Sequence, residues 1–250
     1  MLRCSTIKEG DMNCLQTSLY NLLEDNDFVP SKEYKASIAS YLHSDSSLTP
    51  QAMGKLTGEI FQSKQTMAYY LLHNAINEDE GAERLKMIAN RYAQGEMKQQ
   101  IMHHCQNDRN HSAMYASLIP LTGYQTEVYQ EEKSSDFSNV SHFYDDIKIH
   151  LFRAHSVELR SWCLLVSQLS FIDQSDIPYL KEMRPTIQQI LDDEVRQVSY
   201  TAQHVSQWLA EDPSLCQAFT QCMSHTYRET WDYLASMAEF MRDSAPYFMV

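Results

Sequence analysis

One stretch in the second half of the chain decides how the fold is interpreted: Gln189-Ile-Leu-Asp-Asp-Glu194-Val-Arg-Gln197-Val-Ser-Tyr200. It places an acidic residue, Glu194, three positions before a second polar residue, Gln197, within an otherwise apolar helical pattern. Positions i and i+3 of an α-helix lie on one face about one turn apart, so both side chains can reach the same point in the interior. A carboxylate and an imidazole at this spacing make a good pair of metal ligands, and Gln197 stands where the imidazole would be expected.

The first half of the chain contains an earlier copy of this pattern, Cys105-Gln-Asn-Asp108-Arg-Asn-His111-Ser-Ala-Met-Tyr115. Here the acidic residue is Asp108, and the residue three positions later is His111, whose ring nitrogen can bind a metal. The chain therefore carries two acidic-x-x-polar pairs. One pair is complete, and the other has an amide in place of the imidazole.

The composition favours a single helical domain. With 250 residues, the chain is long enough to bury a substantial core. It has only 6 Gly and 7 Pro, while Met, Leu, Ala, Gln and Glu are plentiful, which favours α-helices over a turn-rich β fold. The formal net charge of −13 disfavours a broad phosphate-binding surface, because nucleic-acid affinity depends largely on Lys and Arg. We therefore expect an all-α protein that does not bind nucleic acid.

The cysteines contain no CxxC pair, which favours reduced thiols. They are Cys4, Cys14, Cys105, Cys163, Cys216 and Cys222. The first residues lack the apolar core of a signal peptide, and no apolar run approaches the length of a membrane span. We expect a soluble, cytoplasmic protein.

Helical periodicity divides the chain into three parts of one compact domain: an extension over 1–65, a four-helix bundle over 66–209 and C-terminal helices over 210–250. The extension consists of short helices, one of them beginning near Ser47-Leu-Thr-Pro50, and it is expected to cap an open end of the bundle. The four bundle helices are expected near 66–93, 97–119, 147–171 and 185–209, with a break at Pro185. The two C-terminal helices are expected at about 214–225 and 227–243.

In the first pair of bundle helices, an apolar stripe at 3-4 spacing includes two glutamates. The stripe consists of Tyr69, Leu72, Ile76, Glu80, Glu83 and Met87. Gln94-Gly95 ends this helix, because Gly is a common C-terminal stop. Glu80 and Asp108 lie 14 and 13 residues from this stop, on either side of it, so in an antiparallel hairpin they reach about the same depth. Glu80 is the preferred inward carboxylate of the first helix, and Glu83 is its rival.

The second pair of bundle helices follows a long polar segment. Residues 121–145 are acidic and exceed the few residues that join antiparallel neighbours, so they are expected to cross the length of the bundle. The third helix places His155 and Glu158 in an apolar stripe, and the fourth does the same for Glu194 and Gln197.

Four ionisable side chains in mid-bundle need a compensating charge, because burying them without partners would be very costly. A dinuclear metal centre would supply that charge, and oxygen-rich ligation with one or two imidazoles suits iron or manganese better than zinc. The arrangement resembles the ferritin-like superfamily of di-iron and di-manganese carboxylate proteins. That family carries Glu, Glu-x-x-His, Glu and Glu-x-x-His on four bundled helices, with a long crossover between the pairs. The resemblance covers about Thr66 to Leu209.

Carried over by position, the resemblance implies metal ligands on all four helices. They are Glu80, Asp108, His111, Glu158, Glu194 and Gln197. Asp108 departs from the family's Glu and is one methylene shorter. Gln197 departs from the second His, and its neutral amide oxygen is a much poorer ligand for iron. His155, one turn before Glu158, is the preferred substitute, whereas His204 lies about 10 Å from Gln197 along the helix axis.

The resemblance implies that two iron ions, or a manganese and an iron ion, activate dioxygen for the oxidation of a substrate held in the bundle. No catalytic residue is expected beyond the metal ligands. Few polar groups flank the expected site, which favours a small, partly apolar organic substrate. The alternative, favoured by Gln197, is a non-catalytic ferritin-like protein with a degenerate metal site. A tRNA-modifying hydroxylase, another ferritin-like activity, is disfavoured by the negative charge.

The expected partner is thus a small-molecule substrate, with neither nucleic acid nor a membrane. Assembly as a homodimer is compatible with the sequence, which leaves the oligomeric state open.

Overall fold

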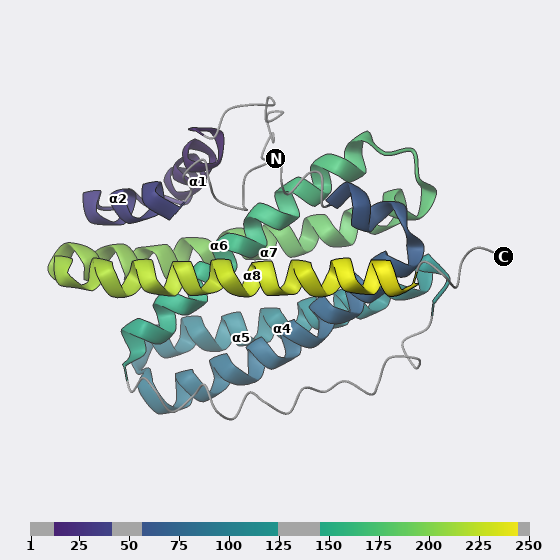
Figure 1. Cartoon of the computed structure of the whole chain (residues 1–250). Helices are drawn as coiled ribbons and strands as arrows, with labels where there is room; N and C mark the ends of the chain where they lie inside the picture. The colour runs from purple at the N-terminus through teal and green to yellow at the C-terminus, as the bar shows by residue number, and fades with distance from the viewer. Residues whose placement is uncertain (1–12, 42–56, 125–145, 245–250) are drawn as a thin grey trace.

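The computed structural model describes residues 13–41, 57–124 and 146–244, and every regular element within them is helical (Figure 1). The labelled α-helices are α1 (Asn13–Asp25), α2 (Lys32–Tyr41), α4 (Lys64–Tyr92), α5 (Gly95–Leu118), α6 (Ile147–Gln174), α7 (Pro178–Glu211) and α8 (Cys216–Ser244), with short 3₁₀ turns η1 (Ile119–Thr122) and η4 (Pro213–Leu215). The all-α class expected from the composition is confirmed for these residues. No helix in the described ranges is both long and apolar enough to cross a membrane.

The first long helices, α4 and α5, form an antiparallel hairpin. The Ser63 hydroxyl caps α4 by accepting the Thr66 N–H, and α4 ends before the two-residue connection of Ala93 and Gln94. Gly95 then opens α5 with a φ of 56°, a backbone conformation that glycine adopts at little cost. The end of the first helix thus lies where the sequence predicted it.

Contacts between these two helices fix their register. The Ser112 hydroxyl of α5 donates to the Ala75 carbonyl of α4 over 2.7 Å. A side-chain carbon built at Gly81 would lie 3.4 Å from Asp108 Oδ2. Positions near 80 in α4 therefore lie at the depth of Asp108, as the hairpin arithmetic predicted.

The second hairpin, α6 and α7, is also antiparallel. Asp146 caps α6 by accepting the Lys148 N–H over 2.9 Å. Near the other end, the Arg184 guanidinium of α7 donates to the Asp173 carboxylate of α6 over 2.6 Å. The two hairpins face each other mainly through α5 and α7, with weaker contact between α4 and α6.

The break expected at Pro185 is absent, because α7 continues unbroken from Pro178 to Glu211. Proline removes one backbone N–H and crowds the preceding turn, so this helix needs packing to offset that cost. Met183 and Ile187, on either side of Pro185, are both fully buried and supply it.

The two C-terminal helices expected from the sequence are one continuous helix, α8. Between its ends there is neither Gly nor Pro to stop it, and a buried stripe extends through Phe219, Met223, Thr226, Thr230 and Met237. This stripe packs α8 chiefly along α6, and in Figure 1 the yellow helix spans the bundle from end to end.

The N-terminal helices pack on the second hairpin. α2 contacts α7 and α8, and the Ser31 N–H just before it donates to Ser206 Oγ over 2.7 Å. The short helix expected at Ser47–Pro50 and the crossover beyond residue 124 lie outside the described residues. In the described part of the chain Cys105, Cys163, Cys216 and Cys222 are free thiols.

Candidate metal centre

Acidic and imidazole side chains from four helices meet between the two hairpins. They are Glu78 of α4, His104, Asp108 and His111 of α5, Glu158 of α6, and Glu194 of α7. Gln197 of α7 joins them through Asp108. All are buried except Glu78, whose side chain is 18% exposed and faces the edge of the cluster.

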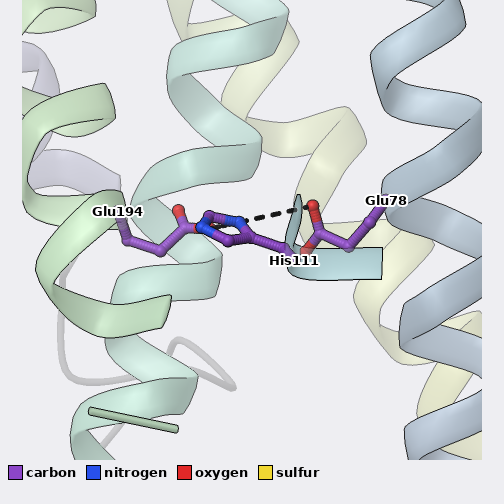
Figure 2. A group of neighbouring side chains, drawn as sticks. All are labelled: Glu78, His111 and Glu194. Atoms are coloured by element: carbon purple, nitrogen blue, oxygen red, sulfur yellow. Dashed lines mark ion pairs between the residues drawn. The ribbon is translucent and has the colours of Figure 1, made fainter. Parts of the chain in front are cut away.

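The tightest group joins Glu78, His111 and Glu194, from three different helices (Figure 2). One donor atom of each lies within 4.8 Å of the other two. His111 Nδ1 is 3.8 Å from Glu78 Oε2 and 3.6 Å from Glu194 Oε1. Figure 2 shows the imidazole between the two carboxylates, so a cation near Nδ1 would contact all three side chains.

The opposite edge of the His111 ring is held by Asp193 of α7. His111 Nε2 lies 3.2 Å from Asp193 Oδ2, and Arg196 pairs with the other oxygen of the same carboxylate. An Nε2–H that donates to Asp193 leaves the Nδ1 lone pair free and aimed at the two glutamates. A carboxylate behind a metal-binding histidine commonly fixes its tautomer and orientation in this way.

A second group forms around His104, one turn before Asp108 on α5. His104 Nε2 lies 3.3 Å from Asp108 Oδ1 and 3.2 Å from Glu158 Oε1. Its other nitrogen, Nδ1, is 2.7 Å from Tyr200 Oη of α7. The two groups share the same interior space, because Glu158 is also hydrogen-bonded to Glu194.

Several buried polar atoms of this cluster have no hydrogen-bond partner among the described residues. They are His104 Nε2, His111 Nδ1, Glu194 Oε2 and Gln197 Oε1. Unpartnered buried polar atoms are costly and rare, so their convergence at one place points to a missing partner. The donor set, rich in carboxylate oxygen with two imidazoles, fits iron or manganese.

The electrostatics of the cluster agree with a site built for cations. Burial raises the pKa of Asp108 to about 8 against the opposing effect of His104. Burial and the charges of Glu158 and Glu78 raise the pKa of Glu194 well above its ordinary value. Burial alone would lower the pKa of His104, but Asp108 and Glu158 raise it to about 9. Protons thus offset the crowded negative charge here, and a bound metal would displace them.

The structure corrects the sequence-based choice of carboxylate on α4, because Glu78 belongs to the cluster and Glu80 does not. Glu80 is partly exposed and lies near the Arg84 charge. Its rival, Glu83, is exposed and pairs with Arg109. Two positions after Glu78, a side chain points about 200° around the helix, so Glu80 faces away from the cluster.

That error arose from choosing the stripe of large apolar residues as the inward face. Tyr69 of that stripe stacks on Phe240 with ring centroids 4.1 Å apart, so the stripe faces α8. The face that packs on α5 carries smaller residues. Its buried positions include Met67, Leu71, Ala75, Ala82, Leu85 and Ala89. Glu78 falls in this line at helical spacing, which is the signal that could have identified it.

His155, the proposed substitute ligand, is a core residue and does not join the cluster. Its Nε2 lies 2.8 Å from Tyr34 Oη and its Nδ1 lies 2.8 Å from Thr201 Oγ1, so both ring nitrogens have partners. Burial lowers the pKa of His155 to about 3. His204 also lies apart, with Nε2 2.7 Å from Gln100 Oε1.

His104 was missed in the sequence, although a signal for it exists. His104, Asp108 and His111 stand at positions i, i+4 and i+7 of one helix and share a face. Only the acidic-x-x-His part of that run was recognised. No family model, curated protein or solved structure matches this chain, so its site is interpreted from its own residues.

Proposed function

We propose that this protein is a ferritin-like dinuclear non-haem iron enzyme, or a mixed manganese and iron enzyme, that oxidises a small organic substrate with dioxygen. The observation that carries the proposal is the convergence of four carboxylates and two imidazoles on unpartnered buried atoms between two antiparallel hairpins.

Charge balance supports two divalent ions rather than one. The four carboxylates, Glu78, Asp108, Glu158 and Glu194, carry a combined charge of −4 when ionised, which two divalent cations neutralise. Four cluster residues, His111 and Glu194 on one side and His104 and Glu158 on the other, are at least nine-tenths buried. A single ion would leave part of that negative charge uncompensated in the interior.

The protein residues would hold, orient and shield the metal. Asp193 keeps His111 in the tautomer that presents Nδ1, and Glu78, the most exposed member, offers a route by which ions and dioxygen reach the centre. Tyr115, two turns beyond Asp108, is buried near the charges of Glu78 and Glu194 and helps to exclude water. When bound, a reduced dinuclear metal centre would supply the electrons that activate dioxygen.

A small, partly apolar substrate is part of the proposal. Trp162 and Leu165 follow Glu158 on α6 at one- and two-turn spacing, and both are buried. Apolar walls beside a metal centre favour an organic molecule over a mineral core, which needs a polar, carboxylate-lined surface.

The test is anaerobic loading of the purified protein with Fe(II) or Mn(II), followed by elemental analysis and exposure to dioxygen. We expect about two metal ions per chain and stoichiometric oxygen uptake by the iron-loaded protein. Glu78→Gln should weaken metal binding by more than the roughly 10- to 100-fold typical of a residue that only supports a ligand. Glu83→Gln, on the same helix but exposed, is the matched control and should bind as the wild type does.

A non-catalytic role is the second candidate, favoured by the amide at Gln197 in place of an imidazole. Correctly folded protein that takes up neither iron nor manganese would establish this alternative and refute the enzymatic proposal. Binding of metal without oxygen uptake would refute the oxidase activity alone.

A further inference from the structure

Helix α7 supports the donors of α5 through three contacts that share one register. Asp193 contacts His111, Gln197 contacts Asp108 and Tyr200 contacts His104. The supporting residues stand at i, i+4 and i+7 on α7, and their partners stand at the same spacing, in reverse order, on α5. Antiparallel helices that pack along these faces bring each pair together.

Gln197 has a specific place in this set. Its side-chain amide Nε2 donates to Asp108 Oδ1 over 3.1 Å, from a residue that is 1% exposed. An imidazole at this position could not make the same contact without losing its aim at the metal. Gln197 is therefore suited to hold the short carboxylate of Asp108 in place.

His104 has the geometry that the missing second imidazole requires. It is 1% exposed, its Nε2 lies within 3.3 Å of oxygens from both Asp108 and Glu158, and that nitrogen has no hydrogen-bond partner among the described residues. Tyr200 Oη meets Nδ1 at 2.7 Å. An Nδ1–H that donates to Tyr200 leaves the Nε2 lone pair directed at the two carboxylates, just as Asp193 directs His111.

We propose that His104, oriented by Tyr200, is the nitrogen ligand of the second metal position with Asp108 and Glu158, and that Gln197 positions Asp108 rather than replacing a lost histidine. One helix, α5, then supplies the imidazoles of both positions. This inference rests on the proposed dinuclear centre, but it is tested by metal content and affinity rather than by activity.

The first experiment measures Fe(II) and Mn(II) stoichiometry and affinity of the anaerobic protein. We expect the wild type to bind two ions, and His104→Ala to keep the ion held by His111 and lose the other. Added imidazole should restore the second ion to His104→Ala, because the free ring can occupy the vacated space. His204→Ala, on α7 and outside the cluster, is the matched control and should keep both ions.

The second experiment compares Gln197→His with Tyr200→Phe. Tyr200→Phe should weaken the second ion by roughly 10- to 100-fold and leave the first unchanged, as removal of an orienting partner does. Gln197→His should not raise the stoichiometry, and it should weaken the second ion because Asp108 loses its hydrogen bond. Circular dichroism and thermal melting of each variant establish that it is folded.

The outcomes separate the two proposals. A folded wild type that binds no metal refutes the dinuclear centre itself. A wild type that holds two ions, both retained by His104→Ala with unchanged affinity, overturns the role of His104 and leaves the centre standing. A wild type that holds one ion and gains a second in Gln197→His also overturns it, because the second nitrogen was then missing as the sequence suggested.

Discussion

The two hairpins carry the same acidic-x-x-polar motif but use it differently. On α5, Asp108 and His111 both face the cluster as donors. On α7, Glu194 faces the cluster, whereas Gln197 donates a hydrogen bond to Asp108. The spacing is the same in both helices, so spacing alone does not determine the role of the second residue.

The difference teaches that the neighbouring helix decides what a motif does. The α5 face pairs with Asp193, Gln197 and Tyr200, which are all of a supporting kind. A helix with such a partner can present donors at several successive turns. A helix that provides the support has fewer positions left for ligands, and on α7 the ligand role falls to Glu194.

Metal removal should have the largest effect on the comparison, because a centre shared by both hairpins holds them together. Two ions, each at about 100 times its Kd, would stabilise the folded protein by roughly 5 kcal/mol. For a chain of this size, chelation should then lower the melting temperature by roughly 10–20 °C. Differential scanning calorimetry with and without a chelator measures this, and hydrogen exchange should show lost protection in α4, α5, α6 and α7 together. Loss confined to one hairpin would contradict a shared centre.

His111→Ala and Gln197→Ala should sharpen the contrast between the motifs. His111→Ala removes a ligand of the tighter position and should weaken metal binding by more than about 100-fold, nearly abolishing it. Gln197→Ala removes only a hydrogen bond to Asp108 and should cost about 10-fold. Titration with Mn(II), followed by its paramagnetic resonance signal, compares the two. Equal losses would mean that Gln197 is itself a ligand.

His155 provides the smallest test, because it asks whether the histidine of the second hairpin is a core residue. Its pKa is lowered to about 3, so the unfolded chain binds a proton that the folded one does not when the pH falls below 6.5. The stability from neutral His155 is fully present above pH 6.5 and should be lost by about 1.4 kcal/mol per pH unit below it.

The comparison protein for this measurement is His155→Gln, which cannot titrate. Urea unfolding of both metal-free proteins at pH 7, 6 and 5 gives the difference in unfolding free energy. Titrations of other residues are common to both proteins and cancel. The advantage of the wild type should shrink as the pH falls, and a constant difference would show that His155 is not buried as a neutral ring.

Much of the fold was predictable because helical periodicity and stop signals are local. The end of α4 before Gly95 and the depth of Asp108 both came from such signals. The continuity of α7 through Pro185 and of α8 through its full length was not predictable in this way. Burial of Met183 and Ile187 stabilises the former, and tertiary packing of this kind has no mark in local sequence.

The candidate site was predicted in part for a related physical reason. Asp108, His111, Glu158 and Glu194 were placed by spacing, and the structure brings all four together. Glu78 was missed because α4 has two apolar faces, and the one with large residues packs on α8 rather than on α5. His155 and His104 are both buried histidines one turn before a cluster carboxylate. Only their partners, Tyr34 and Thr201 for one and open-facing carboxylates for the other, distinguish them.

X-ray absorption spectroscopy of the protein loaded anaerobically with two equivalents of Fe(II) tests the dinuclear centre most directly. The expected spectrum has an oxygen-rich first shell, about one imidazole nitrogen per iron, and an iron neighbour at roughly 3.5–4 Å. His104→Ala loaded in the same way should lose the iron neighbour. Iron bound in the wild type with no second iron in that range, or with no imidazole scattering, would contradict a dinuclear centre held by His104 and His111.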